Sequence, residues 1–251
     1  NPEMQRLYPP ITLGMTAEEV AAKYDVSRED QDEFALSSHH KALAAIDAGR
    51  YDAEIAPIEA PADPRRRTTV TITSDEGPRP DTSLEVLAKL PPVFKEGGTV
   101  TAGNSSPMND GAAALLLATG EGLERHGLDP MARIVATGAA GVHPDIMGIG
   151  PVPASEKALG RAGISADELD VIELNEAFAS QSLASMRLLD LDPAKVNVNG
   201  GAIAIGHPLG ASGARILTTL VHELDRRRGR YGLATMCIGV GQGISTVIER
   251  V

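Results

Sequence analysis

Cys237 is the only cysteine in the 251 residues, and Gly239, Gly241 and Gly243 follow it in the run CIGVGQG. A free thiol has a pKa of about 8.5, so a modest lowering would make it a thiolate near neutral pH. The glycines could offer backbone N–H groups to an oxyanion. Since an unpaired cysteine is also often a small buried hydrophobic residue, the pattern leaves both interpretations open.

Two further polar residues stand where an α/β sheet usually places chemistry, in turns that follow strands. His207 lies in the glycine-rich run NGGAIAIGHPLGASG, just before a helix that Ser212 begins. The N-terminus of that helix would favour a nearby thiolate or oxyanion. Asn175 and Glu176 follow the apolar run DVIEL, where an amide can hold a water or a carbonyl or can cap a helix.

A cysteine, a histidine and an asparagine in three such loops predict thiol or acyl chemistry, and a cysteine hydrolase would use the same residue types. One cysteine and scattered histidines lack metal-ligand spacing, so we expect no metal site. We interpret the remaining histidines as structural: His39, His40, His126, His143 and His222.

The elements that would position these residues read as alternating strands and helices, which predicts an α/β fold. Three capping boxes predict helix starts, at Thr16 with Glu19, Ser27 with Asp30 and Ser165 with Glu168. The second should open a long helix over residues 28–48. Further helices are expected over 154–162, after Asn175 and from Ser212.

Strands are expected at TTVTIT (68–73), ARIVATGAA (132–140), DVIEL (170–174) and KVNV (195–198). Two segments read as strand, glycine-rich turn and strand: GTVTAGNSSPMNDGAAALLLA (98–118) and YGLATMCIGVGQGISTVIERV (231–251). Residues 51–98 are rich in Pro, Arg and Asp and read as loops and small hairpins, where binding residues often lie.

The composition narrows the function classes. The chain has 23 basic and 34 acidic residues, a net charge of −11, which argues against general nucleic-acid or anionic-membrane binding. Arg65–Arg67 could still meet phosphates, although a solvated loop is the simpler interpretation. No apolar run reaches the roughly 18 residues of a membrane helix. One cysteine fits a reducing, cytoplasmic location.

Several motifs together resemble the thiolases. They are NEAFA (175–179), NGGAIAIGHPLGASGAR (199–215), CIGVGQG (237–243), GTVTAGNSSPMNDGAAA (98–114) and MGIGPVPA (147–154). The resemblance covers nearly the whole chain in order. It implies the layered αβαβα thiolase fold, with a loop domain over residues 1–98, the last strands of an incomplete N-terminal core over 99–120 and a complete C-terminal core over 131–251.

The resemblance implies an acyltransferase that forms or cleaves a carbon–carbon bond between acyl units carried on coenzyme A. It assigns Cys237 as the acid/base, His207 as the residue that activates the nucleophile and donates to one oxyanion hole, and Asn175 as the holder of a water in that hole. The backbone N–H of Gly239 would serve a second hole. Positions that would line the coenzyme A tunnel are Arg79, Ala102, Gly103, Ser106, Ala177 and Phe178.

Two departures from the family pattern bear on function. The attacking cysteine of a thiolase has no counterpart here, so we expect this chain alone not to catalyse thiolysis. Thr12 and Leu13 replace the His and Met usual in short-chain biosynthetic members, and Pro107 replaces a preferred Gly. The end YGLATMCIGVGQG looks most like thiolases that degrade β-ketoadipyl-CoA.

The expected substrates are acyl-CoA and CoA, with no permanently bound cofactor, and the expected assembly is a homodimer or homotetramer. One alternative is a non-catalytic CoA-binding or assembly partner that completes a thiolase site with another chain. A ketoacyl synthase would share the fold but generally lacks a cysteine at the position of Cys237.

Overall fold

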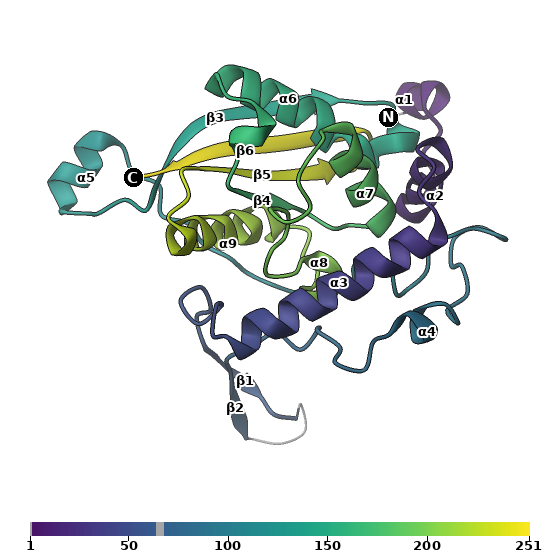
Figure 1. Cartoon of the computed structure of the whole chain (residues 1–251), viewed down its shortest axis with the longest axis horizontal. Helices are drawn as coiled ribbons and strands as arrows, with labels where there is room; N and C mark the ends of the chain where they lie inside the picture. The colour runs from purple at the N-terminus through teal and green to yellow at the C-terminus, as the bar shows by residue number, and fades with distance from the viewer. Residues whose placement is uncertain (1, 64–67) are drawn as a thin grey trace.

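A computed structural model of the chain describes residues 2–63 and 68–251. Its centre is a four-stranded sheet with the order β3 (Ala132–Gly141), β6 (Gln242–Arg250), β5 (Tyr231–Ile238) and β4 (Val171–Leu174) (Figure 1). Strands β3, β6 and β5 pair antiparallel, whereas β4 pairs parallel with β5. The strands expected at 132–140, 170–174 and in the 231–251 segment are therefore confirmed.

Helices cover both faces of this sheet (Figure 1). Ile216, Leu220 and Leu224 of α9 (Ser212–Arg227) cluster with Val171 of β4. On the opposite face, α6 (Pro151–Ala162) supplies Ala158 and Leu159 to a cluster with three residues of the sheet, Ile172, Leu174 and Leu233. Because side chains alternate along a strand, odd positions of β4 face α9 and even positions face α6.

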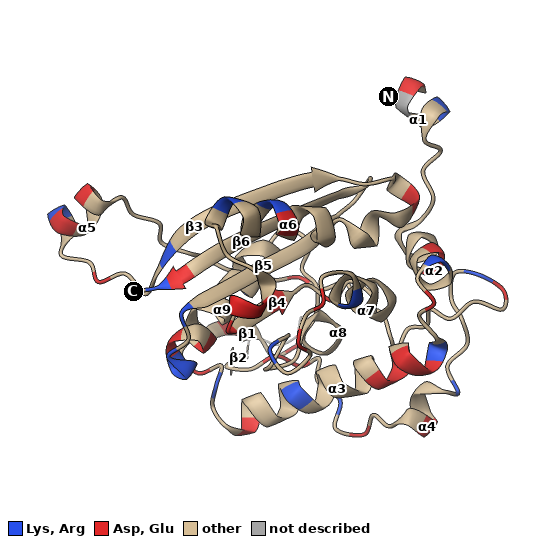
Figure 2. Cartoon of the chain, turned by 45° about the horizontal axis from the view of Figure 1, so that its top comes forward, with Lys and Arg blue, Asp and Glu red and all other residues tan. Residues whose placement is uncertain are grey.

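The long helix α3 (Arg28–Asp47) confirms the expectation for residues 28–48. Ser27 caps it by accepting the backbone N–H of Asp30 at 3.0 Å, and Glu29 and Asp30 lie in its first turn. Figure 2 shows acidic residues, in red, along that end of α3, where the helix dipole favours negative charge. Helix α3 packs on α7 (Ala179–Leu188) and on the short α8 (Ala202–Ile205), which leads to His207.

Smaller elements complete the chain. Residues 68–73 form the predicted strand as β2 (Thr69–Ile72), paired antiparallel with β1 (Ile58–Pro61). Arg65–Arg67 lie outside the described residues. The other helices are α1 (Pro2–Leu7), α2 (Leu13–Lys23), α4 (Leu84–Leu87), α5 (Gly120–His126) and the 3₁₀ helices η1 (Pro144–Ile149) and η2 (Ala166–Glu168).

Two of the three capping boxes begin a helix as expected. The Ser165–Glu168 box is formed, although η2 is a 3₁₀ helix. The prediction at Thr16 is wrong, because α2 already begins at Leu13 and is capped by Thr12. Thr16 lies inside the helix, where its hydroxyl donates to the carbonyl of Leu13 at 2.6 Å.

The strands predicted between residues 99 and 120 do not form. The buried carboxylate of Glu18 accepts the N–H groups of Thr99 and Val100 at 2.9–3.0 Å, so these donors are not available to a sheet. Residues 107–119 are exposed and carry no regular structure, since no strand of the described chain pairs with them. The expected strands at 99–120 are therefore absent from this structure, and the assignment of this segment to an N-terminal core stays a prediction.

The strand predicted over residues 195–198 is reduced to one bridge, between Val196 and Ile172. The chain turns away at Asn197, whose side chain instead brackets the end of β4. Its amide oxygen accepts the N–H of Leu174 at 2.8 Å, and its amide nitrogen donates to the carbonyl of the same residue at 2.8 Å. The side chain takes over the hydrogen bonds of a neighbouring strand.

No helix among the described residues is long and apolar enough to cross a bilayer.

The packing of α9 on the sheet makes a stability prediction. Leu220 is fully buried, so Leu220→Ala should lower the free energy of unfolding by about 2 to 5 kcal/mol through lost burial and a residual cavity. Leu116 is 81% exposed, so Leu116→Ala should cost less than about 0.5 kcal/mol. Urea unfolding followed by circular dichroism measures both, and equal losses would contradict the assigned core.

Candidate functional site

Asn175 and His207 meet at the end of β4. The amide nitrogen of Asn175 lies 3.2 Å from Nε2 of His207, and Nδ1 of His207 lies 2.6 Å from the hydroxyl of Ser212. Asn175 and Ser212 are fully buried, whereas His207 is half-buried. Two of the three predicted loops, together with the start of α9, therefore converge on one imidazole.

The hydrogen bonds define which nitrogen of His207 carries the proton. The single hydroxyl proton of Ser212 is donated to the carbonyl of Pro208 at 2.9 Å, so the hydroxyl oxygen must accept from Nδ1–H of His207. Nε2 of the neutral ring is then an acceptor, which fits the amide nitrogen of Asn175 beside it. The ring is held with its basic nitrogen towards Asn175.

The backbone of Asn175 is held by hydrogen bonds, whereas the oxygen of its side-chain amide is not. Its backbone N–H donates to the carbonyl of Thr235 at 3.0 Å, and its own carbonyl accepts from the side chain of Gln181 at 2.8 Å. The side-chain oxygen Oδ1 is buried and has no hydrogen-bond partner among the residues that the structure describes. A buried amide oxygen of this kind usually binds an ordered water.

The electrostatic surroundings keep His207 neutral. Burial is the main cause that lowers the pKa of His207, and the positive charge of Arg215 lowers it further. A neutral imidazole at physiological pH can accept a proton, as a general base must.

The loop that carries His207 requires glycine at its start. Gly206 has a φ of +98°, and a Cβ there would lie 2.5 Å from the side-chain oxygen of Asn109. The N–H of His207 donates to the carbonyl of Pro107 at 3.3 Å. The extended segment 107–111 therefore passes directly beside His207.

The turn of Ala102–Ser106 lies against Ala177 and Phe178. The N–H and hydroxyl of Ser106 both donate to the carbonyl of Ala177, at 3.1 and 3.0 Å. Ala102 is exposed, while Gly103 and Ser106 are partly buried. Five of the six residues predicted to line a coenzyme A tunnel thus lie close together, and Pro107 connects this group with His207.

The sixth, Arg79, comes from a separate loop. Arg79 is exposed, and its backbone N–H donates to Nδ1 of His39 on α3 at 3.2 Å. Gly77 of the same loop lies so close to α8 that a Cβ there would stand 2.3 Å from the carbonyl oxygen of Ala204. The loop is therefore beside the helix that leads to His207.

Cys237 ends up in apolar surroundings. It is 6% exposed and belongs to a cluster with Ala17, Val100, Met147, Ala177 and Phe178. Burial raises the pKa of the Cys237 thiol to about 12. The expectation of a thiol lowered toward neutrality is not met in this structure, because burial disfavours the thiolate. Gly239 lies in the turn after β5, with open space where a side chain would be.

Glu176 has a structural role that its neighbour Asn175 does not share. Its buried carboxylate accepts from the hydroxyl of Ser38 at 2.7 Å, the amide of Asn197 at 2.8 Å and the N–H of Ile203 at 3.1 Å. These bonds join α3, the end of β4 and the glycine-rich loop before His207. A Cβ at Gly201 would lie 2.2 Å from this carboxylate, so the loop needs glycine there.

Three residues near the site were not assigned a role from the sequence. Ser212 was noted only as a helix start, although a serine five residues after a loop histidine can reach its ring. Glu173 and Arg215 form a buried pair with 3.6 Å between their nearest charged atoms. The sequence signal for Glu173 was its place two residues before Asn175, on the same face of β4.

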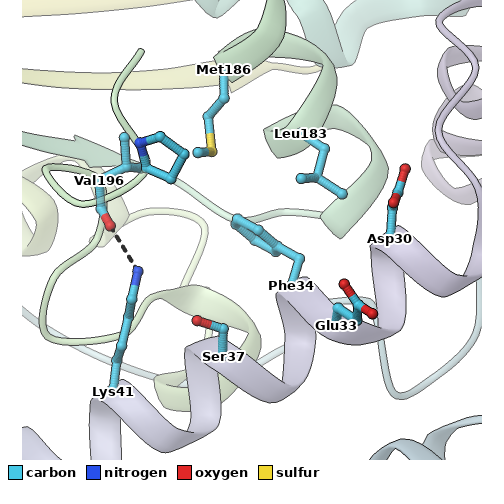
Figure 3. A pocket seen from close by; sticks show the side chains of 9 residues that line it. Asp30, Glu33, Phe34, Ser37, Lys41, Leu183, Met186 and Val196 are labelled. Carbon is cyan, nitrogen blue, oxygen red and sulfur yellow. Dashed lines mark hydrogen bonds between the residues drawn. The ribbon is translucent and has the colours of Figure 1, made fainter.

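Two cavities lie elsewhere. One of about 270 Å³ opens between α3 and α7, where Phe34, Leu183 and Met186 line it and Lys41 donates to the carbonyl of Val196 (Figure 3). The other, of about 730 Å³, lies between residues 114–134 and α9. None of the predicted site residues lines either of them. Among the described residues no group of three or more His, Cys, Asp or Glu is arranged to hold a metal.

Comparison with known proteins identifies the family. The model of the thiolase N-terminal domain matches residues 2–121 and that of the thiolase C-terminal domain matches residues 128–250. The chain belongs to the thiolase family, and the thiolase fold is confirmed. A crystal structure of the Bacillus anthracis acetyl-CoA acetyltransferase superposes with a TM-score of 0.93 at 48% identity, over 96% of this chain and 60% of that one.

Among curated relatives, an acetyl-CoA acetyltransferase of Pseudomonas aeruginosa is 54% identical over 95% of this chain and 60% of its own length. A beta-ketoadipyl-CoA thiolase of the same species is 54% identical over 100% of this chain and 62% of its own. Human mitochondrial 3-ketoacyl-CoA thiolase in complex with CoA superposes with a TM-score of 0.88. The chain thus spans about three fifths of these relatives.

The Ser212 contact predicts a tautomer. In the native chain, the neutral ring of His207 should carry its proton on Nδ1. Ser212→Ala should shift that proton toward Nε2, because the hydroxyl that accepts from Nδ1 is lost. Two-bond ¹H–¹⁵N correlation spectra of the imidazole rings report the tautomer. Thr218→Ala on the same helix, whose hydroxyl binds only a backbone carbonyl, is the control. An unchanged ring in Ser212→Ala would contradict the assignment.

The buried thiol predicts low reactivity. Cys237 should be alkylated by iodoacetamide at pH 8 about a thousandfold more slowly in the folded chain than in urea, because its pKa lies near 12 when folded and near 8.5 when exposed. With one cysteine, intact mass reports the reaction without ambiguity. Equal rates in the folded and unfolded chain would show that the thiol is accessible and ionised.

Proposed function

We propose that this chain supplies the proton-transfer and oxyanion groups of a thiolase that cleaves 3-ketoacyl-CoA with CoA, or runs the reverse Claisen condensation. The observation that carries the proposal is the Asn175–His207–Ser212 arrangement, which holds a neutral imidazole beside an unpartnered buried amide oxygen. Family membership and relatives named as acyltransferases support it.

In the cleavage direction, His207 takes the proton of an attacking thiol at Nε2 and becomes an imidazolium. The thiolate adds to the 3-keto carbon, whose oxyanion accepts the N–H of Gly239. The bond between carbons 2 and 3 then breaks, and its electron pair remains on carbon 2 as the enolate of an acetyl-CoA unit. The enolate oxygen accepts from Nε2–H of His207 and from a water held by Oδ1 of Asn175.

Cys237 completes this step by donating its thiol proton to carbon 2. A thiol whose pKa is raised to about 12 holds that proton at neutral pH and delivers it readily to a strongly basic carbanion. The thiolate left behind takes a proton from the incoming CoA thiol, and the CoA sulfur takes the acyl group. The attacking thiol leaves as a thiolate and recovers its proton from the imidazolium of His207.

The attacking thiol is not Cys237, because that side chain is occupied with proton transfer and it is the only cysteine of the chain. We therefore propose that these 251 residues alone do not complete thiolysis. Residues proposed to contact coenzyme A are Arg79, Ala102, Gly103, Ser106, Ala177 and Phe178. The exposure of Arg79 suits contact with a solvent-facing phosphate.

The proposed substrate class is 3-ketoacyl-CoA. The relatives named for acetyl-CoA and for β-ketoadipyl-CoA are equally similar to this chain, at 54% identity, so the lean toward β-ketoadipyl-CoA rests on the C-terminal motif alone. A homodimer or homotetramer is part of the proposal and is supported by exposed apolar side chains of Met108, Leu116 and Leu117. A cytoplasmic location rests on the single cysteine.

The test is a partial reaction that needs no attacking thiol. In D₂O the chain should exchange the methyl protons of acetyl-CoA for deuterium, since enolisation requires only Cys237, His207 and Asn175. We expect the rate to rise with pH as Cys237 ionises, to vanish in Cys237→Ala and to fall about 10²- to 10³-fold in His207→Gln. Proton NMR of the acetyl group measures the exchange.

His143→Gln, which changes an exposed histidine of a loop, is the matched control and should exchange like the native chain. The same samples should bind CoA by calorimetry. CoA binding without exchange in the native chain would instead identify a non-catalytic partner, and a folded chain that does neither would refute the proposed function. Cleavage of acetoacetyl-CoA by the native chain would show that a separate thiol is not needed.

A further inference from the structure

A second polar pair, Glu173 and Arg215, lies near His207 on β4 and α9, the two elements that also supply its partners Asn175 and Ser212. Glu173 is two residues before Asn175 in β4, so both side chains leave the same face of the strand. Arg215 is one helical turn after Ser212 in α9, so these side chains share a helix face. Asn175 and Ser212 flank His207. Beside them, Nη1 of Arg215 lies 3.6 Å from Oε2 of Glu173.

The guanidinium of Arg215 is buried but is not held by hydrogen bonds. Its three nitrogens Nε, Nη1 and Nη2 have no solvent exposure and no hydrogen-bond partner among the described residues, and Oε1 of Glu173 is likewise unpartnered. A structural arginine–carboxylate pair normally forms two short parallel hydrogen bonds, which also neutralise its charge. This arginine is instead a buried positive charge whose field reaches its neighbours.

Several ionisable groups surround the pair. Glu54, Glu176 and Glu223 act on Glu173 along with Arg215, and burial raises the pKa of Glu173 to about 8. Burial therefore disfavours the charged form of Glu173, which weakens its compensation of Arg215. Tyr51 and Asp75 also lie within the field of Arg215.

His207 is the imidazole that this charge reaches. Residues one turn apart on a helix have Cβ atoms about 5 to 6 Å apart, so Arg215 is a neighbour of Ser212, whose hydroxyl contacts the ring. Arg215 and burial act on His207 in the same direction, toward the neutral form. The side chains that contact the ring, Asn175 and Ser212, are uncharged, and Asp110 lies in the adjoining segment 107–111.

We propose that Arg215 is a positioning residue that acts through its charge to keep His207 unprotonated, so that Nε2 is free to accept a proton. The catalytic meaning of this inference rests on the proposed function, but the protonation state of His207 does not. It can be measured in the chain without substrate.

The test is the pKa of His207 from ¹³C-labelled histidine followed by NMR. Arg215→Met should raise that pKa by about one unit, whereas Arg215→Lys, which keeps the charge, should leave it within a few tenths. His207→Gln identifies the signal among the six histidines.

Arg226 gives a matched control on the same helix. It lies in the last turn of α9 and lowers the pKa of His222 in the way that Arg215 lowers that of His207. Arg226→Met should raise the pKa of His222 and leave His207 unchanged, and Arg215→Met should do the reverse. A rise at both histidines in either variant would indicate a general loosening and would overturn the specific role.

Glu173→Gln distinguishes an effect of the charge of Arg215 from a structural effect of the Glu173–Arg215 pair. It can be measured even if Arg215→Met fails to fold. It keeps the shape of the pair but cannot ionise, so it should not raise the pKa of His207. If the pair only oriented the helix, both variants would move His207 alike, and a rise in Glu173→Gln would overturn the proposal. An unchanged His207 in a folded Arg215→Met chain would overturn it as well.

Activity then links the inference to the proposed function. Deuterium exchange into acetyl-CoA depends on Cys237 and His207 whether or not Arg215 acts, so its absence in the native chain refutes the proposed function and leaves the NMR result standing. With exchange present, its pH profile in Arg215→Met should show the protonation of His207 displaced upward by the same unit that NMR reports.

Discussion

The parallel pairing of β4 with β5 is the constraint on which the rest of the site depends. In a parallel pair both carboxyl ends lie at one edge of the sheet. Leu174 pairs with Thr235, so Asn175, directly after Leu174, and Cys237, two residues after Thr235, both lie at this edge of the sheet. The hydrogen bond from the N–H of Asn175 to the carbonyl of Thr235 continues this register past the last strand residue. A slip by one residue would turn Asn175 to the opposite face and remove it from His207.

Buried polar side chains hold the irregular backbone around this edge. Asn197 brackets the end of β4, Glu18 holds residues 99 and 100, and Glu176 ties α3 to the glycine-rich loop. Each supplies hydrogen bonds that a neighbouring strand or helix would otherwise provide, and each is itself fully partnered at the atoms that do so. Loops fixed in this way can bring three separate segments to one imidazole without the regularity of a sheet. Glycines at 201 and 206 are needed because the backbone passes within contact distance of these side chains.

Burial sets the protonation state of both proposed proton carriers, His207 and Cys237, and shifts their pKa values in opposite directions. It lowers the pKa of His207, which therefore stays a base, and raises that of Cys237, which therefore stays an acid. The same apolar environment thus separates the proton affinities of two groups that are proposed to exchange protons with different atoms of one substrate. The charge of Arg215 adds to this separation on the histidine side only.

The sequence by itself determined the family, the fold class and the residues at the strand ends, because glycine-rich turns, capping boxes and alternating apolar runs are local signals. The helix at 28–47 and the short apolar run of β4 could be read in this way. The sequence could not show that residues 99–119 would lack strand structure, since a strand depends on a partner elsewhere in the chain. It also suggested an easily ionised Cys237, where the structure holds the thiol protonated. Solvent exclusion, the Ser212 contact and the unpaired Arg215 are set by packing between distant segments, so only the tertiary structure decided them.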